Sequence, residues 1–393
     1  MKAMKWKFYS LAFVAGMSIL TACRSDDNND NDGNGGNGNG NEIENGTILK
    51  GTITSDVTLA AGNTYKLSGE YIVEEGATLH IEEGVKIIAV YDDIADYILV
   101  KQGGKINAVG TPDKPIVMTS EKEEPGAWGG IHICGRAHTN AEGGKGSSEI
   151  GGAVYGGNDD ADNSGTLQYI RLEYTGFAFD EEHEANGISF YGVGNGTIVD
   201  HCQAYKGSDD GFEFFGGSVN VSNLVAVSCS DDSFDWTEGW NGKGTNLVAY
   251  QEDKSTLGYD CDCLMECDNN GSNNAATPVA HPVLKNLILV GNGGSKQGIR
   301  LRAGTEVEID NAKVCGKGQP LTVETALTEN ALKNGTSKLT NITLTSELSS
   351  KEGIYTHADF IAVTSNKVDA NLSYSSFEDI RKECSWMNGS WVK

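Results

Sequence analysis

Residues 223–226 (NLVA), 246–249 (NLVA) and 286–289 (NLIL) repeat one pattern, in which an asparagine precedes three aliphatic or alanine residues. Weaker copies stand at residues 311–314 (NAKV) and 341–344 (NITL). Consecutive asparagines of this set are 23, 40, 25 and 30 residues apart. Repeats of roughly 22–25 residues, with occasional insertions, are typical of the coils of a parallel β-helix.

A second element recurs in phase with the asparagines, at residues 187–190 (GISF), 211–214 (GFEF), 233–236 (SFDW) and 298–301 (GIRL). Apolar and polar residues alternate within it, as in strands with one buried face. Each coil therefore has at least two short strands joined by Gly, Asn and Asp turns. Stacked coils repeat about every 4.8 Å, so we expect the asparagines, with His201 in the same column, to form an internal amide ladder.

Composition fits one large, strand-rich body. The chain has 393 residues, 51 of them glycine, and a formal charge of −25. That charge argues against binding to nucleic acid or to anionic membrane surfaces, since phosphates would be repelled. Helical patterning is scarce and predicts only short helices at residues 326–333 and 377–382. We expect an all-β fold with a single solenoid domain over residues 42–393.

The first 22 residues have the pattern of an export signal. Basic residues precede an apolar run at residues 11–20, which is too short to span a membrane. The run ends in LTAC at residues 20–23, which resembles the lipobox of bacterial lipoproteins. That resemblance implies that Cys23 is acylated and becomes the mature N-terminus. The alternative is an ordinary signal peptide that carries a cysteine.

The segment after Cys23 predicts a tether. Residues 24–30 (RSDDNND) resemble the surface-export signal of Bacteroidetes-type lipoproteins, and the chain to residue 41 is almost wholly Asn, Asp and Gly. Such a composition buries no apolar area, so residues 23–41 are expected to be a flexible tether. Together these features predict an outer-membrane lipoprotein on the extracellular face, with the membrane as partner through its lipid.

Four further segments carry a family resemblance: residues 126–133 (GAWGGIHI), 155–157 (YGG), 162–167 (DNSGTL) and 207–213 (GSDDGFE). The chain resembles pectin-lyase-like β-helix proteins that bacteria secrete or anchor by lipid, over roughly residues 50–390. The resemblance implies a single right-handed parallel β-helix and an extracellular setting. This family is defined by fold and location, so the resemblance assigns no catalytic residues.

Three carboxylates are expected to form a column on the outer face of the second strand. Because the apolar members of each strand point inward, Glu213 and Asp235 point outward, one above the other, and Glu266 extends the column if residues 264–266 (LME) are the next strand. Arg300 follows. Like charges in adjacent coils repel, so the column suggests Ca²⁺, which takes about 6–8 oxygen ligands. The alternative is a solvated acidic face with Arg300 as counter-charge.

Two aspartate pairs precede these strands. Asp209 and Asp210 stand 22 residues before Asp231 and Asp232. Stacked pairs of this kind can hold calcium, but satisfying turn amides is the favoured role.

A third acidic segment, residues 160–165 (DADNSG), resembles the first half of a calcium loop through Asp160 and Asp162. The twelfth position is Arg171 in place of glutamate, which argues against an EF-hand and leaves another kind of calcium loop open.

Enzymes with this fold suggest a competing hypothesis. Lyases combine calcium-binding carboxylates with an arginine or lysine base, and Arg300 or Arg302 is the candidate base here. Hydrolases use several aspartates as general acid and base, but the histidine expected near residues 251–253 is absent. For binding without catalysis, Tyr191, Phe215 and Trp240 are candidate exposed aromatics that stack on sugar rings.

Eight cysteines remain besides Cys23, an even number that in an exported protein favours disulfides. A thiolate metal site at Cys261, Cys263 and Cys267 is the less favoured reading.

The sequence therefore favours a surface-exposed, non-catalytic module that binds a glycan or another cell surface, with Ca²⁺ as its one expected cofactor. The alternative is a calcium-dependent polysaccharide lyase or hydrolase acting on acidic glycans. A third interpretation is a purely structural envelope protein, which would bind no ligand.

Overall fold

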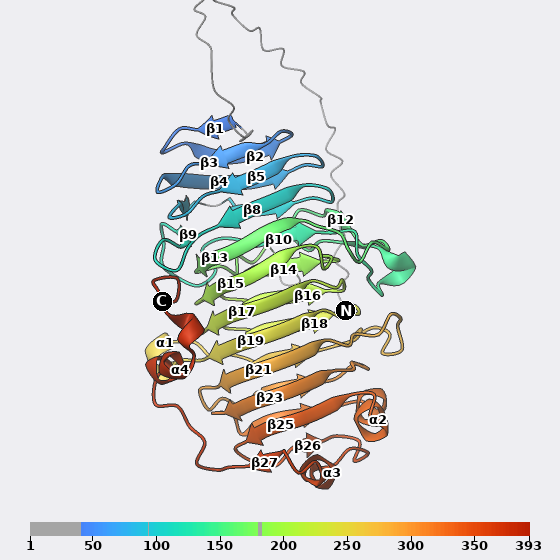
Figure 1. Ribbon diagram of the computed structural model, residues 1–393. Helices are drawn as coiled ribbons and strands as arrows, with labels where there is room; N and C mark the ends of the chain where they lie inside the picture. Colours follow the sequence, from blue (N-terminus) through green and yellow to red (C-terminus); the bar gives the residue numbers. More distant parts are fainter. Residues whose placement is uncertain (1–40, 93, 180–182) are drawn as a thin grey trace, which may run out of the picture. The chain divides into compact units, whose positions relative to one another are not determined.

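A computed structural model describes residues 41–92, 94–179 and 183–393, which fold into stacked coils of parallel strands (Figure 1). The expected leader, Cys23 and the tether as far as residue 40 lie outside the described residues. The hydrogen-bonded strands form three parallel sheets, and each coil contributes one strand segment to each sheet.

The first sheet comprises β1 (Asn41–Ile43), β3 (Val57–Leu59), β5 (Thr78–Ile81), β8 (Lys105–Val109) and the N-terminal halves of seven long strands. These long strands are β13 (Gly165–Glu173), β15 (Ile198–Tyr205), β17 (Asn220–Val227), β19 (Lys243–Tyr250), β21 (Val283–Val290), β23 (Glu308–Cys315) and β25 (Lys338–Leu344). Their C-terminal halves continue the second sheet, together with β2 (Ile48–Ile53), β4 (Thr64–Val73), β6 (Lys86–Ala89), β9 (Ile116–Ser120) and β27 (Lys367–Val368).

The third sheet holds the short strands, and it carries the candidate site. It begins with the ends of β2 and β4 and continues through β7 (Tyr97–Val100), β10 (Ile131–Cys134), β14 (Ile188–Tyr191), β16 (Phe212–Phe215), β18 (Phe234–Thr237), β20 (Met265–Cys267), β22 (Gln297–Leu301), β24 (Gln319–Val323) and β26 (Ser349–Ser350). A small antiparallel hairpin of β11 (Gly146–Ser147) and β12 (Val154–Tyr155) lies in the insertion after β10. The fold is the expected single right-handed parallel β-helix.

The asparagine column divides the long strands between the first and second sheets. Its members have positive φ, for example +55° at Asn223 and +60° at Asn286, a conformation that asparagine tolerates better than most residues. The amides bond from coil to coil, with Asn246 Nδ2 2.8 Å from Asn223 Oδ1 and Asn286 Nδ2 3.0 Å from Asn246 Oδ1. His201, with φ of +53°, occupies the same column as expected.

The prediction that this ladder is internal was wrong. Asn286 and Asn311 are exposed, because a left-handed residue turns the backbone at a corner of the coil and directs its side chain outward. The interior is filled instead by the apolar residues that flank the corner and by stacked rings. Phe190 and Phe214 stack with ring centroids 5.0 Å apart, and Phe214 and Trp240 with centroids 4.2 Å apart.

Helices cap and flank the coils at α1 (Lys254–Leu257), α2 (Ala326–Asn334), α3 (His357–Ala362), α4 (Phe377–Glu383) and the 3₁₀ turns η1 (Glu142–Gly144) and η2 (Ser385–Met387). The helices expected at residues 326–333 and 377–382 are present as α2 and α4. The sequence patterns missed α1 and α3, which are only four and six residues long.

Residues 372–393, here called the C-terminal segment, cover an outward-facing apolar strip of the second sheet. Ile380, Met387 and Trp391 are buried there against a strip that includes Val225 and Val248. The last residues reach much earlier coils, since Ser390 N donates to Pro112 O at 2.8 Å. The C-terminal segment therefore links coils that are distant in the sequence.

Candidate functional site

The predicted carboxylate column exists on the third sheet. Glu213 of β16 pairs in register with Asp235 of β18, and Asp235 pairs with Glu266 of β20. Arg300 of β22 is the next residue in register after Glu266. Alternation explains the placement, because Phe212 and Phe214 on either side of Glu213 are buried in the core.

Turn aspartates add a second row beside this column, and they bond the coils together. The backbone N–H of Asp232 donates to Asp210 Oδ1 at 2.8 Å, and that of Cys263 donates to Asp232 Oδ1 at 2.6 Å. Asn186 begins the same ladder by accepting from Asp210 N at 3.2 Å. The expected turn role is thus present at Asp210 and Asp232, and each uses one carboxylate oxygen for it.

Both rows line one open cavity of about 430 Å³. Its lining, here called the acidic groove, is Glu149, Glu184, Asp209, Asp210, Glu213, Asp231, Asp232, Asp235, Asp262, Glu266 and Arg300. Seven of these eleven residues were candidate calcium ligands from the sequence, and Arg300 was a candidate base. Ten carboxyl groups therefore surround one space, with a single cation among the lining residues.

Burial, together with the like charges of neighbouring carboxylates, raises the pKa values of several of these carboxyl groups. Burial, followed by the charges of Asp231 and Glu184, raises the pKa of Asp209 to about 7. Burial is also the largest cause at Glu213 and Asp235, whose pKa values lie well above the usual range, with neighbouring carboxylates adding to it. These groups bind protons at pH values where isolated carboxyl groups are ionised.

Hydrogen-bond donors reach only some of the carboxylate oxygens in the groove. Asn186 Nδ2 donates to Glu213 Oε2 at 2.6 Å. Asp235 has no such donor at one oxygen: its Oδ1 is buried and has no hydrogen-bond partner. A buried carboxylate oxygen without a partner is costly, so this position calls for a proton or a cation.

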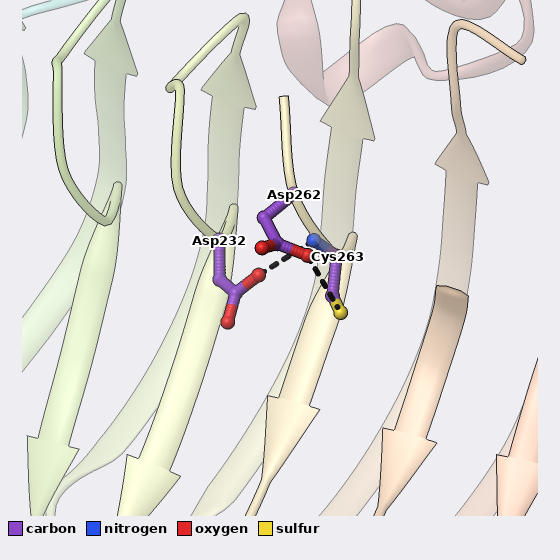
Figure 2. A group of neighbouring side chains, drawn as sticks. All are labelled: Asp232, Asp262 and Cys263. Carbon is purple, nitrogen blue, oxygen red and sulfur yellow. Dashed lines mark hydrogen bonds between the residues drawn. The ribbon is translucent and has the colours of Figure 1, made fainter. Parts of the chain in front are cut away.

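Oxygen atoms in the groove converge closely enough to share a metal ion. Three groups of carboxylates have ligand atoms within 4.8 Å of one another: Asp209, Asp210 and Asp231; Asp210, Glu213 and Asp235; and Asp232, Asp235 and Glu266. Figure 2 shows a fourth group, Asp232, Asp262 and Cys263, at the turns before β18 and β20. The first and third of these groups have no residue in common, so the groove has the donor set for more than one hard cation.

Both candidate base arginines are held in ion pairs. Arg300 contacts Glu266 at 2.9 Å and Glu324 at 3.2 Å, while Arg302 pairs with Glu266 and Asp268. Burial lowers the pKa of Arg300, but hydrogen bonding to Glu324 and the charge of Glu266 outweigh it, so the net pKa is raised. The pKa of Arg302 is raised in the same way, against burial, by Asp268. An arginine kept protonated is poorly suited to remove a proton from a substrate.

Asp160 and Asp162 lie outside the acidic groove. Asp160 Oδ1 is 2.6 Å from His138 Nδ1, and Asp162 Oδ2 accepts the backbone N–H of Arg136 at 3.0 Å. Both contacts join the two ends of the insertion between β10 and β13 to each other, so the structure gives the calcium-loop hypothesis no support.

The expectation of exposed aromatic side chains was wrong at all three positions. Tyr191 and Phe215 do face out of the third sheet and stack with centroids 4.4 Å apart, but they are 0% and 7% exposed. The insertion after β10 folds over them and places Tyr155 5.1 Å from Tyr191. Trp240 turns inward onto Phe214 and is also buried.

The expected disulfides are not present either. The eight cysteines of the described residues are all free and buried. Cys263 is the one that borders the acidic groove, through the group drawn in Figure 2.

Sequence reasoning missed three acidic members of the groove, namely Glu149, Glu184 and Asp262. A signal for Asp262 was available, since Asp209, Asp231 and Asp262 each stand four residues before an outward carboxylate of the third sheet. Glu149 and Glu184 come from segments outside the repeat, so no periodicity marks them.

Fold and site together define the class of protein: a right-handed parallel β-helix with an acidic groove on its third sheet. The chain belongs to the family of the pectate-lyase like beta helix domain, whose family model matches residues 51–392. No curated protein matches the chain, and no solved structure does. Among the described residues, no helix is both long and apolar enough to cross a membrane.

Proposed function

We propose that the acidic groove binds Ca²⁺ and that the protein is a non-catalytic module that holds an acidic glycan through the bound cations. One observation carries the proposal: ten carboxyl groups line a single cavity beside one arginine, and Asp235 Oδ1 is buried there without a partner. Carboxylates at such distances repel unless protons or cations compensate them. A divalent cation compensates two charges at once.

Calcium suits the donors better than a softer metal. Three of the four converging groups contain carboxylates alone, and no histidine is among the groove's lining residues in the described part of the chain. Hard oxygen ligands in a flexible arrangement favour Ca²⁺, whereas Zn²⁺ prefers nitrogen and sulfur.

Bound cations would also decide what else the groove accepts. Without them its charge repels an acidic polymer. A Ca²⁺ ion takes about 6–8 oxygen ligands, so an ion held by three carboxylates on an open face keeps positions for outside oxygens. Carboxylates or sulfates of a glycan supply such oxygens, which supports an acidic ligand.

The surroundings of Arg300 and Arg302 support binding over elimination chemistry. Each guanidinium is paired with two carboxylates, and its pKa is raised. No lysine is among the lining residues of the described groove that could replace them as base. The paired arginines therefore support binding over elimination.

A hydrolase is the second candidate, and one observation favours it. The pKa of Asp209 is raised to about 7, in the range that suits a general acid at neutral pH. Asp231, one coil away, lies in the same converging group and would serve as its ionised partner.

The test incubates the purified protein with polygalacturonate, alginate, a sulfated glycan and a neutral glucan, each in Ca²⁺ and in EDTA. Binding is followed by co-sedimentation, elimination by ultraviolet absorbance of unsaturated products, and hydrolysis by new reducing ends. We expect calcium-dependent binding of the acidic polymers and no products. Binding that is equal in EDTA, or that favours the neutral glucan, would overturn the proposal.

Two matched variants test whether glycan binding depends on the acidic groove. Asp235→Asn removes a carboxylate shared by two converging groups, while Glu347→Gln removes an exposed charge outside the groove. We expect the first to weaken binding and the second to leave it unchanged. Products that disappear in Asp209→Asn would establish the hydrolase instead.

We further propose that the module stands on the outer face of the outer membrane, anchored through Cys23. The lipobox-like LTAC and the acidic segment after it support this placement. Labelled fatty acid should enter the wild-type protein but not Cys23→Ser, and protease added to intact cells should remove the wild-type protein. Labelling of Cys23→Ser would contradict the anchor.

A further inference from the structure

A second cavity lies beside the asparagine ladder, on a different sheet boundary from the acidic groove. It has a volume of about 190 Å³. One wall is the ladder itself, and the other is the C-terminal segment around α4 and η2. Its lining residues include Asn286, Asn311 and Ile288 from the coils and Glu383 and Trp386 from the C-terminal segment.

The ladder wall presents a regular row of amide groups. Asn286 Nδ2 donates to Asn246 Oδ1 at 3.0 Å, and Asn311 Nδ2 donates to Asn286 Oδ1 at 2.9 Å. A side-chain amide has two N–H groups and two acceptor lone pairs. Asn286 therefore spends one of each on the ladder and retains one donor and one acceptor. Neighbouring hydroxyl groups of a sugar ring need this combination, since each can donate and accept.

The opposite wall supplies an apolar contact. The indole of Trp386 is half-buried and packs on the cluster that holds the C-terminal segment to the coils. Ile288, only 8% exposed, continues the apolar surface across the floor of the cavity. An aromatic ring beside a row of amides is well suited to a sugar, whose C–H faces are apolar and whose rim is polar.

Charge in this cavity is balanced. Lys313 and Glu383 form an ion pair across it, and they are the only two charged residues among the described lining residues. The cavity therefore favours an uncharged ligand, in contrast to the acidic groove. Its volume is below the roughly 300 Å³ at which pockets for drug-sized ligands begin, which suits one sugar ring.

We infer that this cavity is a binding subsite for a single neutral sugar ring, held by the amides of Asn286 and Asn311 and by the ring of Trp386. The subsite needs no cation, so it operates independently of the acidic groove. On a glycan with both neutral and acidic residues, this subsite would thus bind a neutral residue while the acidic groove binds an acidic one through Ca²⁺.

The experiment is saturation-transfer NMR on the purified protein in EDTA, with the methyl glycosides of glucose, galactose, mannose and N-acetylglucosamine as probes. We expect at least one glycoside to bind, with signals from its ring protons. Asn286→Gly should weaken that binding about tenfold, the factor that corresponds to one lost hydrogen bond. Trp386→Ala should abolish it.

Asn223→Gly is the matched control. Asn223 belongs to the same ladder and has a similar φ, +55° against +60° at Asn286, so glycine fits the backbone at both positions. Each residue makes two ladder bonds, but Asn223 does not line the cavity. The inference is overturned if no probe binds, if Asn223→Gly weakens binding as much as Asn286→Gly, or if binding survives in both Asn286→Gly and Trp386→Ala.

Discussion

Replacing Asp235 with asparagine should stabilise the metal-free protein and reduce the stabilisation that calcium gives. Asp235 stands in register between Glu213 and Glu266, and its Oδ1 is buried without a partner. Burial raises its pKa well above the usual range, and Glu266 and Asp268 raise it further, against the opposing charge of Arg302. Asparagine has nearly the same shape without the charge.

The sign follows from proton linkage. A carboxyl group whose pKa is raised by folding contributes stability below its unfolded pKa, and that contribution is lost as the pH rises through the folded pKa. At about pH 8 the wild-type groove therefore carries the cost of ionised, crowded carboxylates. A buried polar group without a hydrogen-bond partner costs about 1–3 kcal/mol, and Asp235 Oδ1 is such a group. Removing the charge at Asp235 should therefore raise the free energy of unfolding in EDTA by about that amount.

Calcium should stabilise the wild-type protein more than the variant. Binding at one hundred times the dissociation constant stabilises a protein by about 2.7 kcal/mol. Asp235 belongs to two converging groups, so the variant should lose tenfold or more in affinity and with it about 1.4 kcal/mol of that stabilisation per site.

Urea unfolding followed by circular dichroism, in EDTA and in millimolar Ca²⁺, measures both effects. Glu347→Gln serves as the control for a general change of charge. A variant that is less stable than wild type in EDTA would refute the electrostatic reasoning, and equal stabilisation of both proteins by Ca²⁺ would refute the metal site.

Three further predictions concern the pH dependence of stability, the buried Glu329 and the C-terminal segment. In EDTA the melting temperature should fall as the pH rises from about 5 to 8, because the pKa of Asp209 is raised to about 7; a melting temperature that is flat or rising across this range would contradict the shift. Glu329→Gln should cost about 2–4 kcal/mol in urea unfolding, because the buried carboxylate accepts from Ser350 Oγ and from the backbone N–H groups of residues 352, 354 and 355 at 2.6–3.0 Å; a loss below about 1 kcal/mol would show that these bonds are replaced by water. Deleting residues 372–393 should expose Val225 and Val248 and increase binding of the dye ANS; unchanged dye fluorescence with an unchanged melting temperature would show that the C-terminal segment is dispensable.

The repeat was predictable because stacking imposes it. Asparagine at a fixed place marks the left-handed corner in coil after coil, and alternation in residues 211–214 and 233–236 fixes which side chains face out. Register then follows, so the column from Glu213 to Arg300 could be predicted before any coordinates. The error at the ladder concerned direction alone: the same backbone conformation that selects asparagine turns its side chain toward solvent.

What the sequence did not predict came from segments that break the repeat. The insertion after β10 supplies Glu149 to the acidic groove and also buries Tyr191 and Phe215, which removes them as sugar platforms. Contacts between an insertion and a distant coil do not recur from repeat to repeat, so the sequence pattern does not reveal them. The same holds for Trp386, which comes to lie beside Asn286 only because the C-terminal segment folds back.

The C-terminal segment changes how such a solenoid unfolds. In a simple stack each coil touches only its neighbours, so stability is a sum of local terms and ends can fray independently. Here Lys393 Nζ pairs with Glu173 at 3.0 Å, Lys393 N donates to Gln203 at 2.8 Å, and Arg171 donates to Ser390 O at 2.6 Å. The middle coils thus receive some of their contacts from a segment that lies about two hundred residues later in the sequence, so they reach full protection only once the C-terminal segment has folded back. A single proteolytic cut near the C-terminus would then loosen coils nearly two hundred residues upstream.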